Sequence, residues 1–199
     1  MSNPAAHELG AIELPAPRWE RANALTEMLK VRRSAREFST RTLPLDVLST
    51  LLWSAFGINR EDKAGRTAPS AHNWQEMEVF AVLAEAAYRY DAAENVLRLV
   101  KAGDLRALTG MQDFVGGAPV DLVYVADFRR MRDATPEQRA FFAAADAGVI
   151  GQNVYLFCAC TGLATVVRGL IDRRKLAAAL GLGVDQRIIL AQSVGFPRS

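Results

Sequence analysis

The chain has 199 residues, 50% of them hydrophobic and 23% charged, an ordinary globular composition that predicts a single domain over residues 1–199. Its 24 basic and 22 acidic residues give a net charge of +2, too small a basic excess to favour a nucleic-acid partner. No apolar run approaches the roughly 20 residues that span a bilayer, and the start MSNPAAHELG does not resemble a signal peptide, so no membrane partner is expected.

The first part of the chain predicts an extended arm followed by two helices. Residues 1–17 contain three prolines and are expected to be extended. Residues 18–33 place apolar side chains at helical spacing, and residues 45–56 (LDVLSTLLWSAF) form a stronger amphipathic pattern that Gly57 should end. Residues 39–44 should form the turn between the two helices.

A long polar loop and most of the predicted strands occupy the middle of the chain. Residues 59–73 (NREDKAGRTAPSAHN) are rich in side chains that bind ligands, and a loop of this length is typically functional or disordered. Residues 76–83 (EMEVFAVL) look like a strand, and residues 118–127 (APVDLVYVAD), with their valines and other apolar side chains, predict the clearest one. Residues 87–91 and 95–100 resemble a hairpin.

The longest predicted helix covers residues 138–161. Thr135 should cap its start, and Gly162 should end it. Its first half is almost entirely small or apolar, so we expect a buried central helix that another helix can approach closely. This helix is therefore also a candidate subunit interface.

The remaining segments complete the predicted fold class. Residues 164–171 should be extended, Asp172 should cap a helix over 173–180, and residues 187–195 should form the last strand. This order lacks regular alternation of strands and helices, which favours an α+β fold with a mostly antiparallel or mixed sheet. No Rossmann or P-loop pattern is present, so any nucleotide must bind in another way.

The cysteines and histidines predict neither a metal site nor a disulfide. Cys158 and Cys160 would lie on different faces of one helix, where they cannot easily bridge, and we expect two buried free thiols. His7 and His72 are the only histidines, which predicts no zinc site. Free thiols fit a reducing compartment, and we expect a cytoplasmic location.

The segment VRRSAREF (31–38) is the first candidate binding site. It places the guanidinium groups of Arg32, Arg33 and Arg36 beside the hydroxyl of Ser34, and guanidinium groups match the oxygens of a phosphate. The alternative is a solvated helix end, where basic side chains interact favourably with the helix dipole. On these residues alone the two interpretations carry equal weight.

Other candidates are weaker individually. Asn73 can both donate and accept hydrogen bonds, as the edge of a ring ligand requires, but with Ser70 it could belong to a plain surface loop. Arg168 and Gly169 could present a backbone N–H to a ligand or form an ordinary turn, and Arg198 could be a free tail. No nucleophile–base arrangement is evident, which suits a cofactor that carries the chemistry itself.

Together these motifs make the chain resemble the nitroreductase superfamily of FMN-dependent oxidoreductases. The branch it looks most like includes the dehydrogenases of thiazole- and oxazole-forming systems. The segments that carry the resemblance, in order, are RRSAREF (32–38), LDVLSTLLWSAFGINR (45–60), RTAPSAHNWQEMEVFAV (66–82), DAGVIGQNVYLFCACTGLATVVRG (146–169) and VGFP (194–197).

The resemblance implies a sandwich in which helices flank a mostly antiparallel sheet. It also implies a homodimer formed through long helices, with two FMN sites at the subunit interface and both chains contributing to each site. The partners that the resemblance implies for this chain are NAD(P)H and a small electron-poor acceptor. Hydride would pass between them through flavin N5 by a ping-pong mechanism. No protein side chain is then needed as a catalytic residue.

The resemblance also assigns cofactor contacts to individual residues. Arg32, Arg33 and Ser34 would meet the FMN phosphate and ribityl chain, while Arg36 would reach either the phosphate or the N1/O2 side of the ring. The partner subunit would supply Pro69, Ser70 and Asn73. The segment against the isoalloxazine would be Val167, Arg168 and Gly169, and Arg198 would help to hold the phosphate.

The sequence departs from the family pattern at three places. Many relatives have an acidic residue at the position of Arg168, and some continue well beyond Pro197. His72 replaces a residue that is often small or Met. Alternatives to the NAD(P)H-dependent reaction are a flavin dehydrogenase that oxidises an azoline-like ring, a non-catalytic flavin-binding protein, and a nucleic-acid binder.

Overall fold

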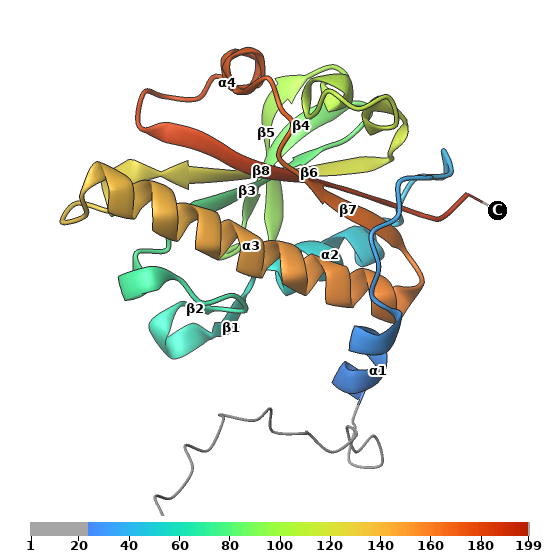
Figure 1. Cartoon of the computed structure of the whole chain (residues 1–199), viewed down its shortest axis with the longest axis horizontal. Helices are drawn as coiled ribbons and strands as arrows, with labels where there is room; N and C mark the ends of the chain where they lie inside the picture. The colour runs from blue at the N-terminus through green and yellow to red at the C-terminus, as the bar shows by residue number, and fades with distance from the viewer. Residues whose placement is uncertain (1–23, 199) are drawn as a thin grey trace, which may run out of the picture.

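The computed structural model describes residues 24–198, which form a six-stranded antiparallel sheet with helices on both faces (Figure 1). The strand order is β5-β4-β3-β6-β8-β7, and every neighbouring pair is antiparallel. The strands are β3 (Met77–Val82), β4 (Ala86–Asp91), β5 (Val96–Ala102), β6 (Val120–Asp127), β7 (Ala164–Arg168) and β8 (Gln186–Gly195). The predicted α+β class and the antiparallel sheet are confirmed. The predicted arm at 1–17 lies outside the described residues.

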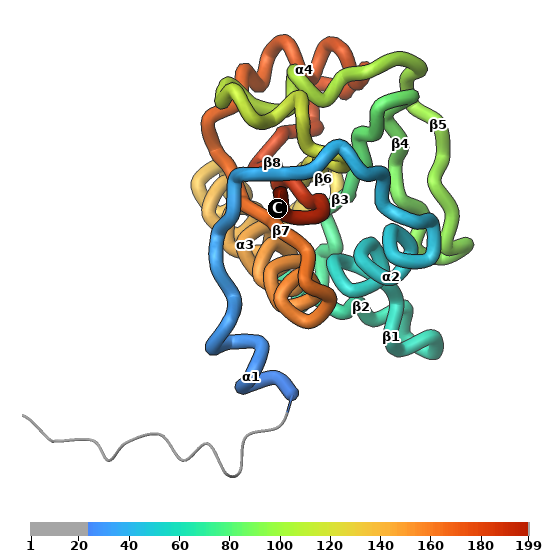
Figure 2. Tube along the Cα trace, turned by 90° about the vertical axis from the view of Figure 1, so that its right-hand side faces the viewer, coloured from blue at the N-terminus to red at the C-terminus, as the bar shows by residue number. Residues whose placement is uncertain are grey.

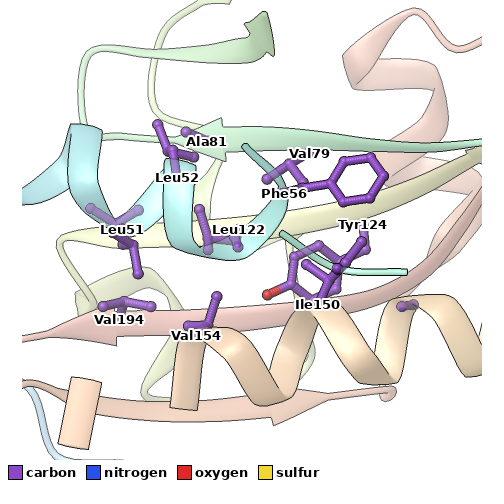
Figure 3. Close-up of a cluster of buried hydrophobic side chains, with 14 of the residues drawn as sticks. Leu51, Leu52, Phe56, Val79, Ala81, Leu122, Tyr124, Ile150, Val154 and Val194 are labelled. Atoms are coloured by element: carbon purple, nitrogen blue, oxygen red, sulfur yellow. The ribbon is translucent and has the colours of Figure 1, made fainter. Parts of the chain in front are cut away.

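Four α-helices accompany the sheet in the described residues: α1 (Ala24–Val31), α2 (Leu45–Phe56), α3 (Pro136–Thr161) and α4 (Arg173–Leu180). The central strand β6 is buried along its whole length, so both faces of the sheet are covered. Leu122 and Tyr124 pack under α2 and α3 (Figure 3), whereas Val123 and Val125 pack under α4. The main core therefore lies between the sheet and the α2/α3 pair.

The start and end of α3 are set by the predicted signals. Thr135 forms a full capping box with Gln138, Pro136 occupies the first turn, and Gly162 adopts φ 72° in the left-handed region. Gly57 also ends α2 as predicted, but its φ of −71° is not left-handed. Glycine is needed there because a Cβ atom would lie 2.5 Å from the Trp53 side chain.

One face of α3 is buried within the chain, as predicted for a central helix, and the opposite face is exposed in the single chain. Ala143, Ala147 and Ile150 are in the core, while the outer face of small and apolar residues is exposed. That outer face is formed by Phe141, Ala144, Ala145, Gly148 and Val149.

The same helix has the length and apolar composition of a membrane span, at 26 residues with a mean hydropathy of 1.2 in its most apolar window. It is not an uninterrupted apolar run, because Asp146, Gln152 and Asn153 interrupt the apolar residues, in line with the expectation from the sequence. The core helix of a globular domain meets the same criteria. Ile150 and Val154 of α3 pack against the sheet, so α3 is a core helix of this kind (Figure 3).

Three predictions need correction. The predicted loop at 59–73 contains its own small ladder, β1 (Ile58–Arg60) paired with β2 (Gly65–Arg66), and two short 3₁₀ turns. The first helix ends at Val31, because the chain then leaves it to follow the edge of the sheet. Cys158 is buried but Cys160 is exposed, since two positions on a helix differ by about 200°.

Candidate functional site

The segment after α1 runs along the free edge of β7 and so brings the arginine cluster to the sheet. The Ala35 N–H donates to the Thr165 carbonyl at 2.9 Å, and the Ser39 N–H donates to the Phe196 carbonyl at 2.9 Å. Phe38 pairs with Pro197 between these two contacts. Figure 2 shows this part of the chain passing beside β7 and the C-terminus.

Tyr155 of α3 connects the segment to β7. Its hydroxyl lies 2.7 Å from the Ser34 hydroxyl and accepts a 3.0 Å hydrogen bond from the Val167 N–H, while the Arg32 guanidinium lies 5.1 Å from the centre of its ring. The Tyr155 hydroxyl can therefore donate to Ser34 and leave the Ser34 proton for an acceptor on a ligand. Sequence reasoning missed Tyr155, a single aromatic hydroxyl within a run of apolar residues.

A cavity of about 560 Å³ opens beside this contact. Arg32 and Arg33 line it together with Tyr155 and Thr165, and none of the residues 24–198 that line it is acidic. Within residues 24–198, no acidic side chain forms an ion pair with Arg32 or Arg33. Uncompensated guanidinium groups beside hydroxyls suit a phosphate, so the donor set fits the FMN phosphate assigned from the sequence.

Arg36 and Arg198 line a different cavity, of about 370 Å³, which also contains Asp113 and Phe114. The Arg198 N–H donates to the Glu37 carbonyl at 3.3 Å, which places Arg198 beside the segment. The structure thus divides the predicted arginine cluster between two neighbouring cavities.

The Arg168 side chain points into the protein and away from any ligand at the β7 edge. It is 3% exposed and donates to the Asp121 carboxylate at 2.7 Å, to the Ser193 hydroxyl at 3.1 Å, and to the carbonyl and hydroxyl of Thr109 at 2.8 and 3.1 Å. Burial lowers the pKa of Arg168, and burial raises the pKa of Asp121 to about 6 against the opposing effect of the guanidinium. Arg168 can offer a ligand only its backbone, whereas Gly169 is exposed.

The loop that carries Pro69, Ser70 and Asn73 lies elsewhere on α3. The Ala71 N–H donates to the Asp146 carboxylate at 3.0 Å. Asp146 precedes Tyr155 by nine residues, which corresponds to roughly 13 Å along the helix. The structure therefore does not bring this loop together with the arginine cluster within one chain.

Gln75 holds this loop through several hydrogen bonds. Its N–H donates to the Ser70 hydroxyl at 2.8 Å, and its side-chain amide donates to the Asn73 side-chain oxygen at 3.1 Å. His72, Asn73 and Gln75 all have φ near +50°, a conformation that costs a non-glycine residue about 1 kcal/mol or more. His72 packs its ring 4.5 Å from the ring of Trp74, so the loop is ordered by aromatic contacts as well.

A buried pair of carboxyl groups lies under the same loop. Glu76 is fully buried, and neither of its carboxyl oxygens has a hydrogen-bond partner within residues 24–198. Burial raises the pKa of Glu76 to about 7, and the neighbouring Asp146 carboxylate adds to the increase. The burial of Glu76 therefore favours its protonated form.

The sequence and fold match known proteins over most of the chain. A family model described as the nitroreductase family matches residues 29–196. A protein of Methanocaldococcus jannaschii named a putative nitroreductase is 28% identical over 155 residues, which cover 73% of this chain and 78% of that protein.

Two solved structures extend the comparison. A protein of the same description from Ralstonia eutropha JMP134 is 46% identical and superimposes with a TM-score of 0.85, covering 94% of this chain and 89% of that one. A chain of the Escherichia coli microcin synthetase McbBCD complex shares the fold at 17% identity, with a TM-score of 0.75 and coverage of 99% and 79%.

Proposed function

The chain belongs to the nitroreductase family, and on this basis we propose that it is an FMN-dependent NAD(P)H oxidoreductase. Family membership supports a flavin-type oxidoreductase. The finer proposal is that hydride passes by a ping-pong mechanism from NAD(P)H to a small electron-poor acceptor, such as a nitroaromatic or quinone-like molecule. When bound, FMN would supply the hydride-exchanging N5 position, and the protein would bind and orient the reactants.

The observation that carries this proposal is the set of uncompensated donors at the edge of β7. Arg32 and Arg33 line a cavity to which the described part of the chain contributes no carboxylate, and Tyr155 contacts the Ser34 hydroxyl next to them in the chain. We assign the phosphate to these donors. Arg36 and Arg198, in the neighbouring cavity, would supply positive charge to the phosphate or to the N1 side of the ring, where reduction places negative charge.

The same geometry supports a homodimer. The loop with Pro69, Ser70 and Asn73 contacts α3 at Asp146, nine residues before Tyr155 and the arginine cluster. This separation supports a contribution of the loop to the partner's site. The exposed outer face of α3, including Ala145 and Gly148, offers small side chains that let a second copy approach closely.

Replacing Arg32 or Arg33 with alanine should weaken FMN binding about tenfold to a hundredfold. Each change removes a charge-assisted contact to the phosphate, typically about 1.5–3 kcal/mol. Flavin fluorescence during titration of the apoprotein measures the dissociation constant. Arg174→Ala, which removes an equal charge from α4, is the control and should bind FMN normally. Tight, full flavin occupancy in both variants would show that the phosphate binds elsewhere.

Tyr155→Phe should lower FMN affinity severalfold without unfolding the chain. The change removes the hydroxyl that Ser34 and the Val167 N–H share, and one neutral hydrogen bond contributes about 1 kcal/mol. A double-mutant cycle with Ser34→Ala tells whether Tyr155 affects FMN affinity by positioning the Ser34 hydroxyl or by its own packing. If Tyr155 acts through Ser34, Tyr155→Phe should cost little further affinity in the Ser34→Ala background; full additivity would contradict this role.

The reaction itself is tested by the colour and turnover of the purified chain. Release of FMN on denaturation, together with steady-state reduction of a nitroaromatic by NADH or NADPH, would support the proposal. Bound FMN that no nicotinamide reduces would favour the dehydrogenase or the non-catalytic alternative. A colourless chain that refuses added FMN would refute all three.

A further inference from the structure

Arg66 is a half-buried cation without a carboxylate partner in the described part of the chain. Its guanidinium lies 4.9 Å from the centre of the Phe56 ring and donates to the Gln75 side-chain oxygen and the Phe56 carbonyl, both at 3.2 Å. These contacts use two of its five N–H donors. Desolvation lowers the pKa of Arg66, so the surrounding protein does not fully compensate its charge.

Arg130 provides a second cation at the same place. Its guanidinium donates to the Gln75 carbonyl at 3.0 Å, so one residue accepts hydrogen bonds from both arginines. The positive charge of Arg130 contributes to the lowered pKa of Arg66. No carboxylate within residues 24–198 forms an ion pair with Arg130, since nearby Asp127 is engaged by Arg129 at 2.6 Å. Two positive charges are thus held close together. The Asp91 carboxylate acts to raise the pKa of Arg66 without reversing its lowering, and it forms its ion pair with Arg98.

Both arginines line one cavity of about 190 Å³ between the β1/β2 ladder and strands β3 and β4. The other charged groups in its lining are already paired. Glu78 binds Arg89 at 3.2 Å, and Asp91 binds Arg98 at 2.7 Å. The cavity therefore retains the positive charge of Arg66 and Arg130, and its volume suits a single phosphate group better than a nucleobase with its sugar.

We propose that Arg66 and Arg130 form an anion site that binds a phosphate group. Two guanidinium groups match the double negative charge of a phosphate monoester and present donors in the planar arrangement that its oxygens accept. This site is distinct from the Arg32/Arg33 cavity, and the proposal stands independently of flavin binding.

Gln75 couples this anion site to the loop above it. It receives hydrogen bonds from both arginines and gives hydrogen bonds to Ser70 and Asn73. A phosphate between the arginines fixes both guanidinium groups and with them the left-handed backbone of Gln75. Occupation of the anion site therefore rigidifies the loop that carries Ser70 and Asn73.

The test is calorimetric titration of the purified chain with inorganic phosphate, with sodium chloride keeping the ionic strength constant. The wild-type chain should bind phosphate, and Arg66→Gln or Arg130→Gln should weaken that binding about tenfold or more. Arg130 is exposed, so Arg130→Gln keeps the test valid if Arg66→Gln fails to fold. The matched control, Arg174→Gln on the opposite face of the sheet, should leave binding unchanged.

Binding at the flavin site is separated by repeating the titrations in an Arg32→Ala background, which should leave phosphate binding at Arg66 and Arg130 intact. Absence of phosphate binding in Arg32→Ala, or binding that is undiminished when either glutamine variant is added to Arg32→Ala, would overturn the anion site. None of these results depends on whether the chain binds FMN.

Comparison of NADP⁺ with NAD⁺ then identifies the source of the phosphate group. If a phosphorylated dinucleotide is the ligand, tighter binding of NADP⁺ in the wild type should disappear in Arg130→Gln. If free phosphate is the ligand, the ratio of the two affinities should be the same in both proteins, while inorganic phosphate binding still depends on Arg130. Either pattern supports a phosphate site.

Discussion

Arg168→Met should lower the free energy of unfolding by about 3–5 kcal/mol, because it leaves the buried Asp121 carboxylate without its counter-ion. The side chains of Arg168 and Asp121 are 1% and 0% exposed, and Arg168 also satisfies Thr109 and Ser193. Urea denaturation followed by circular dichroism measures the loss.

The surface pair Arg98–Asp91 provides the control for this variant. Its side chains are 51% and 25% exposed, so Arg98→Met should cost no more than about 1 kcal/mol. Asp121→Asn introduced together with Arg168→Met should restore part of the stability, because it removes the uncompensated charge. Equal losses for Arg168→Met and Arg98→Met would contradict the assigned role.

Glu76→Gln should increase stability at pH 8 and leave it nearly unchanged at pH 4. The pKa of Glu76 is raised in the folded chain from 4.5 to about 7, so the folded chain retains a proton that the unfolded chain has lost. The stability of the wild type should therefore fall as the pH rises from about 4.5 through 7, by roughly 3 kcal/mol in total. Glutamine keeps the shape of the acid and can donate to Asp146, and it has no charge to bury.

The measurement is the urea midpoint of both proteins between pH 4 and pH 8. The difference between Glu76→Gln and the wild type should grow with pH and level off above pH 7. Glu85→Gln, at an exposed position in the turn between β3 and β4, controls for the loss of one acidic group. Parallel pH profiles for Glu76→Gln and the wild type would show that Glu76 does not carry the proton.

Local sequence signals predicted the elements of the fold well. The bounds of α2 and the capping of α3 by Thr135 and Gly162 depend on side chains within a few residues of each helix end. The exposed outer face of α3 could not be predicted in this way. Small residues surround the helix, and the contacts of Ala147 or Ile150 with the sheet depend on the whole fold.

The candidate site was also predictable only where it depends on residues close together in the sequence. Residue type and clustering singled out Arg32, Arg33 and Ser34. The structure places Arg32 and Arg33 on one cavity and Ser34 against Tyr155, and their contacts with FMN stay predictions. Tyr155 and the inward direction of Arg168 depend on partners that are distant in sequence, such as Asp121, and local patterns contain no information about these. The contributions of Pro69, Ser70 and Asn73 to a partner's site remain a prediction.

The segment from Ala35 to Ser39 also protects the sheet against aggregation. An uncovered edge strand offers free backbone groups to which a strand of another molecule can add. The hydrogen bonds from this segment to Thr165 and Phe196 occupy that edge beside β7, while charged Arg98 and Lys101 lie on β5 at the opposite edge. The backbone that carries the arginines therefore also covers part of the β7 edge, where a strand of another molecule could otherwise add.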